Sequence, residues 1–293
     1  MEGRKKIERV TSKILNLFFY LCLALVVWML VQVCCYTSFK IPSDSMEPVL
    51  LAGDRIVVDK MCRGARLFDV FAALRNEKVA IRRLPALGSF QHNDVLVFNF
   101  PYKERWDSIC FDVMKYYVKR CIALPGDTLE IRNGFYRVSG VKDTLGNMAS
   151  QKRVSLLTRE TAPEGVMNTF PWNEKLGWTI KEFGPLPVPA KGQVVKMDSL
   201  SWLFYRQLIG WEQGKSLKIK GNRVSLGDSL ISHYRFQENY YFVSGDKMEN
   251  SQDSRYWGML PEAFIVGKAV CVWQSREPST GEWRWDRFLL KIK

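Results

Sequence analysis

One uncharged stretch near the N-terminus constrains this chain more than any other feature of its sequence. From 14 to 36 no residue carries a charge, and most are leucine, valine or aromatic. At 1.5 Å per residue, about 23 residues form a helix roughly 35 Å long, which exceeds the ~30 Å hydrocarbon core of a bilayer. We therefore predict a transmembrane helix over 14–36.

The flanks of this segment predict its orientation. Five basic and two acidic residues precede it, whereas Lys40 is the first basic residue after it. By the positive-inside rule, 1–13 is then a basic cytoplasmic N-terminus, and the chain after about residue 37 lies outside the membrane. The run ends Gln32-Val33-Cys34-Cys35-Tyr36, without the small-x-small site of a secretory signal, so we expect an uncleaved anchor.

After the anchor, the sequence is dominated by short runs of apolar and β-branched residues, which predict strands. Gly221-Asn222 separates two such runs and is a typical hairpin turn. Apolar residues at helical spacing favour helices at 67–75 and at about 199–210. The class is mainly β, and the predicted strands are 55–58, 95–100, 116–122, 128–131, 217–219, 240–243 and 264–273.

Two serines lie between two prolines just beyond the anchor, in Pro42-Ser43-Asp44-Ser45-Met46-Glu47-Pro48. Proline fixes its own φ and pushes the preceding residue toward an extended conformation. We therefore expect Ser43 to Ser45 to form a stiff, extended ledge that could hold a nucleophile. Serine, aspartate and proline are also common in surface turns, so the interest of this stretch depends on other motifs.

Four further motifs follow, and with the serine stretch they form a recognisable series. They are Tyr117-Val118-Lys119-Arg120, Leu124-Pro125-Gly126-Asp127, Ser244-Gly245-Asp246, and the run from Asn250 to Gly258. Taken in order, the series resembles the motif boxes of the bacterial type I signal peptidases, which are membrane-bound Ser/Lys proteases that remove signal peptides.

The residues themselves argue against a histidine-assisted serine. The chain has two histidines, His92 and His233, and neither lies beside a nucleophile motif; the G-x-S-x-G elbow is absent. A lysine can act as the base if burial keeps its amine neutral. Lys119 lies in a predicted strand, on one face with Tyr117 and Cys121. A lysine in a strand is usually solvated, so the sequence pattern alone does not select it.

The resemblance to the signal peptidases implies a role for each of six residues. Ser45 is the nucleophile and Lys119 the general base. Ser43 donates its hydroxyl to the oxyanion beside the backbone N–H of Ser45, and Ser251 orients the lysine amine. Asp253 and Arg255 are the remaining pair, and two interpretations of them stay open. They could support the site structurally, or they could form a solvated pair on the surface.

The same resemblance implies an architecture. In the family, a folded antiparallel β catalytic domain carries a smaller, partly β insertion. The serine stretch, the lysine strand and the Ser251 segment must come together, yet no motif lies in 139–239. We therefore predict a catalytic core made of 37–138 and 240–293, interrupted by an inserted domain at 139–239.

Two motifs depart from the family pattern. The family usually has Arg-Gly-Asp where this chain has His92-Asn93-Asp94, and Asn-Arg-Asp-Asn-Ser where it has Lys247-Met248-Glu249-Asn250-Ser251. Ser45, Lys119, Ser43 and Ser251 are retained, so we expect these changes to affect local loop structure or preference rather than the reaction. Asp127 and Asp246 each follow a glycine and read as turn residues.

Charge and cysteines bear on partners and cofactors. The formal net charge is +13, but lysine and arginine are spread along the chain without a nucleic-acid motif, so we expect attraction to anionic membrane lipids and no nucleic-acid partner. No metal or organic cofactor is indicated. Four exported cysteines have scattered spacing; we expect them to pack in the core and leave a disulfide open, as we do the oligomeric state. They are Cys62, Cys110, Cys121 and Cys271.

The expected function is that of a membrane-anchored serine endopeptidase. It would remove signal peptides from exported preproteins with a Ser/Lys dyad, from the outer (periplasmic) face of the bacterial inner membrane. Two alternatives stay open at this point. One is a Ser/Lys processing peptidase dedicated to one secretion or conjugation system, and the other is a catalytically decayed, membrane-anchored interaction protein.

Overall fold

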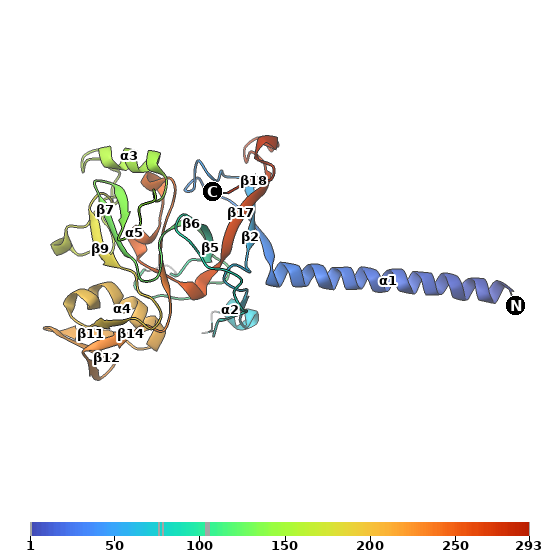
Figure 1. Cartoon of the computed structure of the whole chain (residues 1–293), viewed down its shortest axis with the longest axis horizontal. Helices are drawn as coiled ribbons and strands as arrows, with labels where there is room; N and C mark the ends of the chain where they lie inside the picture. Colours follow the sequence, from blue (N-terminus) through green and yellow to red (C-terminus); the bar gives the residue numbers. More distant parts are fainter. Residues whose placement is uncertain (1, 76, 78, 103–105, 293) are drawn as a thin grey trace.

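A long N-terminal helix projects from a β-rich body in the computed structural model (Figure 1), which describes residues 2–75, 77, 79–102 and 106–292. This helix, α1, spans Glu2–Cys34. Its part Thr11–Cys34 has a mean hydropathy of 2.6 and no residue buried against the protein, so it is long and apolar enough to cross a membrane. The predicted membrane helix is confirmed as a candidate by length and composition. It ends before Tyr36, which already belongs to the first strand.

The body is built on an eight-stranded sheet in which the paired strands are antiparallel. Its order is β1-β2-β17-β5-β6-β15-β16, with β18 added to β17. The sheet confirms the mainly β class. Its strands are β1 Tyr36–Lys40, β2 Asp54–Asp59, β5 Val95–Asn99, β6 Tyr116–Ala123, β15 Tyr240–Ser244, β16 Leu260–Pro261, β17 Ile265–Ser275 and β18 Leu290–Lys291.

The helix is tied directly to this sheet. β1 follows α1 after one residue and pairs with β2 along its whole length. The Lys60 ammonium donates to the carbonyl oxygens of Gln32 at 2.8 Å and Val33 at 3.3 Å, near the end of α1 where carbonyls lack helical partners. The anchor and the sheet are therefore joined by hydrogen bonds as well as by the chain.

The segment between β6 and β15 forms smaller sheets, two α-helices and the short 3-10 helix η1 Glu174–Leu176. β7 Thr128–Arg132 pairs with both β8 Phe135–Val138 and β9 Phe183–Pro187. The predicted hairpin at Gly221-Asn222 is present between β11 and β12. The other elements are α3 Met148–Leu156, α4 Ser199–Gln213, β10 Val194–Lys196 paired with β14 His233–Arg235, and β11 Leu217–Lys220, β12 Arg223–Leu226 and β13 Ser229–Ile231 in one sheet.

One of the two predicted helices is present at the expected place, and the other is shorter than predicted. The helix expected at 199–210 is α4, which runs on until Gly214 ends it with φ 62°. The prediction at 67–75 was too long, because Leu67 lies in β3 Arg66–Leu67, which pairs with β4 Arg82–Arg83. Only α2 Val70–Leu74 is helical there, and Asp69 caps its start. Tertiary strand pairing outweighed the helical spacing of this short segment.

One hydrophobic core connects the main sheet with the segment between β6 and β15. It contains Leu96 and Phe98 of β5 together with Phe204 and Leu208 of α4. A second, smaller cluster includes Met46 and other residues between the serine stretch and the sheet. The proposed inserted domain at 139–239 thus packs onto the sheet that carries Lys119.

Candidate active site

The serine stretch forms a turn, which we call the serine turn (43–50). The Glu47 N–H donates to the Asp44 carbonyl at 2.9 Å, and the Leu50 N–H donates to the Met46 carbonyl at 2.9 Å. The predicted extended ledge was therefore wrong. Proline restricts only itself and the residue before it, which leaves Ser43 to Ser45 free to bend. Rigidity comes instead from burial, because Met46 and Leu50 are 1% and 0% exposed.

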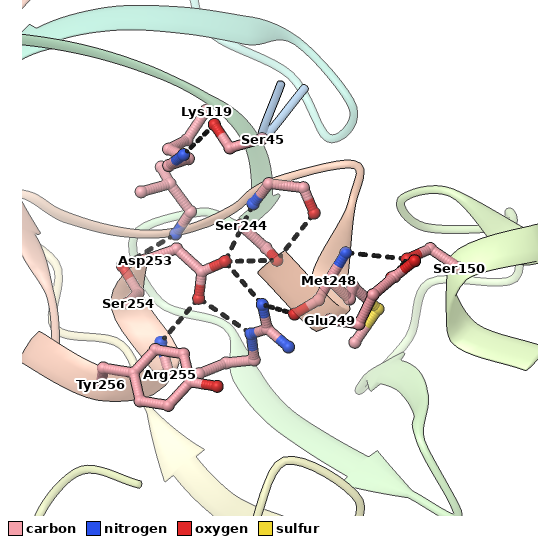
Figure 2. A network of polar contacts seen from close by, with 12 residues as sticks. Ser45, Lys119, Ser150, Ser244, Met248, Glu249, Asp253, Ser254, Arg255 and Tyr256 are labelled. Atoms are coloured by element: carbon pink, nitrogen blue, oxygen red, sulfur yellow. Dashed lines mark hydrogen bonds and ion pairs between the residues drawn. The ribbon is translucent and has the colours of Figure 1, made fainter. Parts of the chain in front are cut away.

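Lys119 reaches the serine turn from β6. Its side chain is buried, and its Nζ donates to Ser45 Oγ at 2.6 Å (Figure 2), although the two residues are 74 positions apart in the sequence. Burial disfavours the charged amine and lowers the pKa of Lys119 from 10.5 to about 8, against the opposing effect of the Asp253 carboxylate. The two residues predicted to react are in direct contact.

The donors expected for an oxyanion lie at the same turn. Ser43 is exposed, two residues before Ser45. Within the described part of the chain, neither the Ser43 hydroxyl nor the Ser45 N–H makes a hydrogen bond. Both groups are therefore available to a ligand.

Ser251 lies near the backbone of Ser45 without bonding to Ser45 or Lys119. It ends the 3-10 helix η2 Met248–Asn250, and its buried Oγ has no hydrogen-bond partner among the described residues. Gly245 lies between Ser251 and the serine turn. A Cβ built on Gly245 would come within 2.2 Å of Ser251 Oγ and within 2.6 Å of the Ser45 carbonyl oxygen. The expected contact between Ser251 and the Lys119 amine is absent from this conformation.

Asp253 and Arg255 form a buried ion pair beneath the site. Both side chains are 0% exposed, and Arg255 donates to Asp253 from Nε at 2.8 Å and from Nη2 at 2.7 Å. Asp253 also accepts from the Gly245 N–H and caps α5 Ser254–Trp257 (Figure 2). A solvated surface pair is therefore excluded, and the segment is a short helix. The pair holds in place the backbone on which Gly245 and Ser251 lie.

A second buried ion pair was missed at the sequence level. Asp246 was expected to be a turn residue, yet it accepts from Arg120 Nε and Nη2 at 2.6 Å each, with side chains 1% and 7% exposed. Arg120 follows Lys119 in β6, so the ion pair fixes the lysine strand to the 245–246 segment. A buried arginine needs an acidic partner, but the strand pattern gave no sign that Arg120 is buried, so the sequence held no signal for this pair.

The first departure from the family pattern is accommodated by its own contacts. Asn93 adopts φ 69°, a left-handed conformation that glycine and asparagine tolerate best. Its side chain accepts from the Gly146 N–H at 2.8 Å. His92 Nε2 lies 2.7 Å from Asp127 Oδ2, and Asp127 also accepts from the Leu124 N–H as a turn residue would. These contacts lie in the loop that precedes β5, the strand that pairs with the Lys119 strand.

No group of three or more metal-binding side chains is found among the described residues. Cys121 is buried in the core, as expected. A serine hydroxyl beside a buried amine with a lowered pKa, with free N–H and O–H donors on the same turn, can carry out acyl transfer without a histidine.

Comparison with known proteins gives a consistent result. A family model described as "Signal peptidase, peptidase S26" matches residues 13–274. A protein named signal peptidase I from Buchnera aphidicola subsp. Baizongia pistaciae is 25% identical, covering 96% of this chain and 83% of its own. Those from Aquifex aeolicus and Pseudomonas aeruginosa are 27% and 28% identical; each alignment covers 81% of this chain, and 75% and 64% of theirs. The chain belongs to the signal peptidase family, peptidase S26.

Proposed function

We propose that the chain is a membrane-anchored serine endopeptidase that removes N-terminal signal peptides from exported preproteins. The contact of 2.6 Å between Lys119 Nζ and Ser45 Oγ carries the proposal, because it joins a nucleophile to a buried base. Relatives that align over most of the chain are named signal peptidase I. Those names give no support to a dedicated or decayed alternative.

In the first step, the neutral Lys119 amine takes the proton of Ser45 Oγ as the oxygen attacks the scissile carbonyl. The carbonyl oxygen becomes an oxyanion. The Ser43 hydroxyl and the Ser45 N–H donate to this oxyanion, and both are free to do so. Burial favours the neutral amine, which makes Lys119 a competent base near pH 8.

In the second step, the protonated Lys119 gives its proton to the leaving amine of the mature protein, and a water then hydrolyses the acyl-enzyme. Ser251 has a buried, unpartnered hydroxyl close to the pair. We assign it the role of accepting a hydrogen bond from the Lys119 ammonium once that cation forms. Asp253 and Arg255 support this segment from below.

The proposed location is the bacterial cytoplasmic membrane, crossed once by α1, with the N-terminus in the cytoplasm and the β-rich body on the periplasmic side. The basic residues before the apolar segment support this orientation, and the net charge of +13 supports contact with anionic lipids. The family resemblance implies small residues at positions −1 and −3 of the substrate, bound in shallow apolar pockets.

The direct test uses the full chain purified in detergent. It is incubated with a preprotein, and the products are identified by mass spectrometry, with Ser45→Ala as the control. We expect one cut after the signal peptide by the wild-type protein and none by the variant. Cleavage by folded Ser45→Ala, or a wild-type protein that leaves the preprotein intact, would overturn the proposal. Depletion in cells then separates a general enzyme, which leaves many preproteins unprocessed, from a dedicated one.

A further inference from the structure

The second departure from the family pattern lies directly against the serine turn. Lys247 Nζ donates to Asp44 Oδ2 at 2.5 Å and to Glu47 Oε2 at 3.2 Å. The Lys247 N–H donates to the Ser45 carbonyl at 3.1 Å, and Asn250 Nδ2 donates to Asp44 Oδ2 at 3.0 Å. These bonds link segments about two hundred residues apart, and the two acidic partners flank Ser45 on both sides.

The 247–250 turn that presents Lys247 is itself fixed from behind. Met248 is completely buried, and its N–H donates to Ser150 Oγ at 2.7 Å while its carbonyl accepts from Arg255 Nη2 at 2.8 Å. Glu249, labelled beside Ser150 in Figure 2, accepts from Ser150 Oγ at 2.5 Å. It also accepts from Arg153 Nε at 2.6 Å. Ser150 and Arg153 belong to α3, so the inserted segment holds this turn rigidly against the serine turn.

The Lys247 ion pairs contribute little to overall stability. The side chains of Lys247, Asp44 and Glu47 are 29%, 38% and 36% exposed, and pairs at such exposure are weakly stabilising because water already solvates both charges. Their geometry is nonetheless specific, because one ammonium bridges carboxylates on both sides of the nucleophile. The pairing holds Asp44 ionised: its hydrogen bond to Lys247 lowers the pKa of Asp44, and the same contact raises the pKa of Lys247.

We propose that Lys247 is a positioning residue for the nucleophile, whose ammonium fixes the serine turn through Asp44 and Glu47 so that Ser45 Oγ stays within reach of Lys119. The inference depends on the proposed role of Ser45. In this proposal Lys247 and Asp44 act together, because the Lys247 ammonium can fix the serine turn only where acidic side chains face it. It also couples α3 of the inserted segment to the geometry of the reaction.

The test is a double-mutant cycle on the detergent-solubilised full chain, with kcat, KM and melting temperature measured for preprotein cleavage. We expect Lys247→Met and Asp44→Asn each to lower kcat on the order of tenfold to a hundredfold, as a small misplacement of a reacting group does. KM and melting temperature should change little. The double variant should be no slower than Lys247→Met alone, because that change already removes the bond between Lys247 and Asp44. Lys247→Arg should recover most of the wild-type kcat, since arginine can donate to both carboxylates.

A matched control is Lys268→Met. Lys268 is 34% exposed and also lies 2.5 Å from a carboxylate, that of Asp94, but it contacts neither reactive residue. The kcat of Lys268→Met should equal that of the wild type. The inference is overturned if folded Lys247→Met retains wild-type kcat, if the two single losses multiply in the double variant, or if arginine gives no recovery. If Lys247→Met does not fold, Asp44→Asn decides by the same kcat criterion. A wild-type protein that fails to cleave would contradict the proposed function, whereas a cleaving wild type with unaffected variants would contradict this inference alone.

Discussion

The lowered pKa of Lys119 gives the sharpest test of the mechanism. A general base works only when it is unprotonated, so activity must follow deprotonation of this amine. With a pKa of about 8, roughly 9% of the enzyme carries a neutral Lys119 at pH 7 and about 91% at pH 9. We therefore expect kcat/KM, which reports on the free enzyme, to rise about tenfold between pH 7 and pH 9 and then to level off.

The alternative, an unshifted lysine, predicts a different curve. With the ordinary pKa of about 10.4, well under 1% of the amine is neutral at pH 7, and the rate would climb about tenfold per pH unit through pH 9. The assay is kcat/KM for a preprotein from pH 6 to pH 10 in one detergent buffer series, with melting temperature checked at each end. A profile that is still rising tenfold per unit at pH 9 would refute the desolvation argument.

Substitution of the lysine tests the same reasoning. Lys119→Arg keeps the positive charge but cannot deprotonate at usable pH, so it should be as inactive as Ser45→Ala. Lys218→Arg is the matched control, because Lys218 is an exposed lysine on β11, and its rates should be normal. Near-normal turnover by Lys119→Arg would overturn the Ser/Lys mechanism even in an active peptidase.

Burial of this amine also affects stability, with a defined sign. The folded-state pKa of Lys119 lies below that of the unfolded chain, so the folded state binds its proton less tightly, and the free energy of unfolding rises with pH between about 8 and 10.4. Below pH 8 the folded state carries the full cost of burying the charged Lys119 amine. For a pKa shift of this size, that cost lowers the free energy of unfolding by about 3 kcal/mol. Lys119→Met should therefore raise the free energy of unfolding at pH 7 by up to about this amount, measured by urea denaturation. A Lys119→Met variant with a lower free energy of unfolding than the wild type at pH 7 would contradict this prediction.

Three further predictions concern other parts of the molecule. Ser43→Ala should slow the chemical step on the order of 10²-fold, because one of two oxyanion donors is lost while the Ser45 N–H remains; an unchanged single-turnover rate would make Ser43 a loop residue. Asp246→Asn removes the carboxylate charge that faces the buried Arg120 and should lower the free energy of unfolding by up to about 3–5 kcal/mol in urea denaturation; an unchanged free energy of unfolding would disagree. Protease added to intact spheroplasts should digest the chain beyond residue 37, whereas full protection would reverse the proposed orientation.

Much of the fold could be predicted because the relevant signal is local. The apolar segment at 14–36, the strands at 95–100 and 116–122 and the Gly221-Asn222 hairpin each follow from the pattern of neighbouring residues. Hydrophobic periodicity and turn chemistry act over a few residues, so they can be interpreted without knowing the topology. The helix predicted at 67–75 was too long for the same reason. Its helical spacing is a local signal and gave no sign that β3 would pair with β4.

The site was predictable only in part. Ser45 and Lys119 were identified because their motifs resemble those of a known family, and nothing in the strand pattern alone marks Lys119 as buried. The turn at 43–50 was missed, since it depends on hydrogen bonds and on Met46 packing in the core rather than on the two prolines.

The sequence by itself determined the mainly β class and the apolar segment long enough to cross a membrane, and the family resemblance of its motifs pointed to the proposed reactive residues. Only the tertiary structure decided which charges are paired. Asp246 meets Arg120, 126 residues away, where β15 pairs with β6, and Lys247 meets Asp44, 203 residues away, where the turn after β15 lies against the serine turn. An ion pair leaves no periodic trace in a sequence, and whether a charge is solvated or buried depends on what packs over it. The burial that lowers the pKa of Lys119 is set in the same way, by residues distant in the chain.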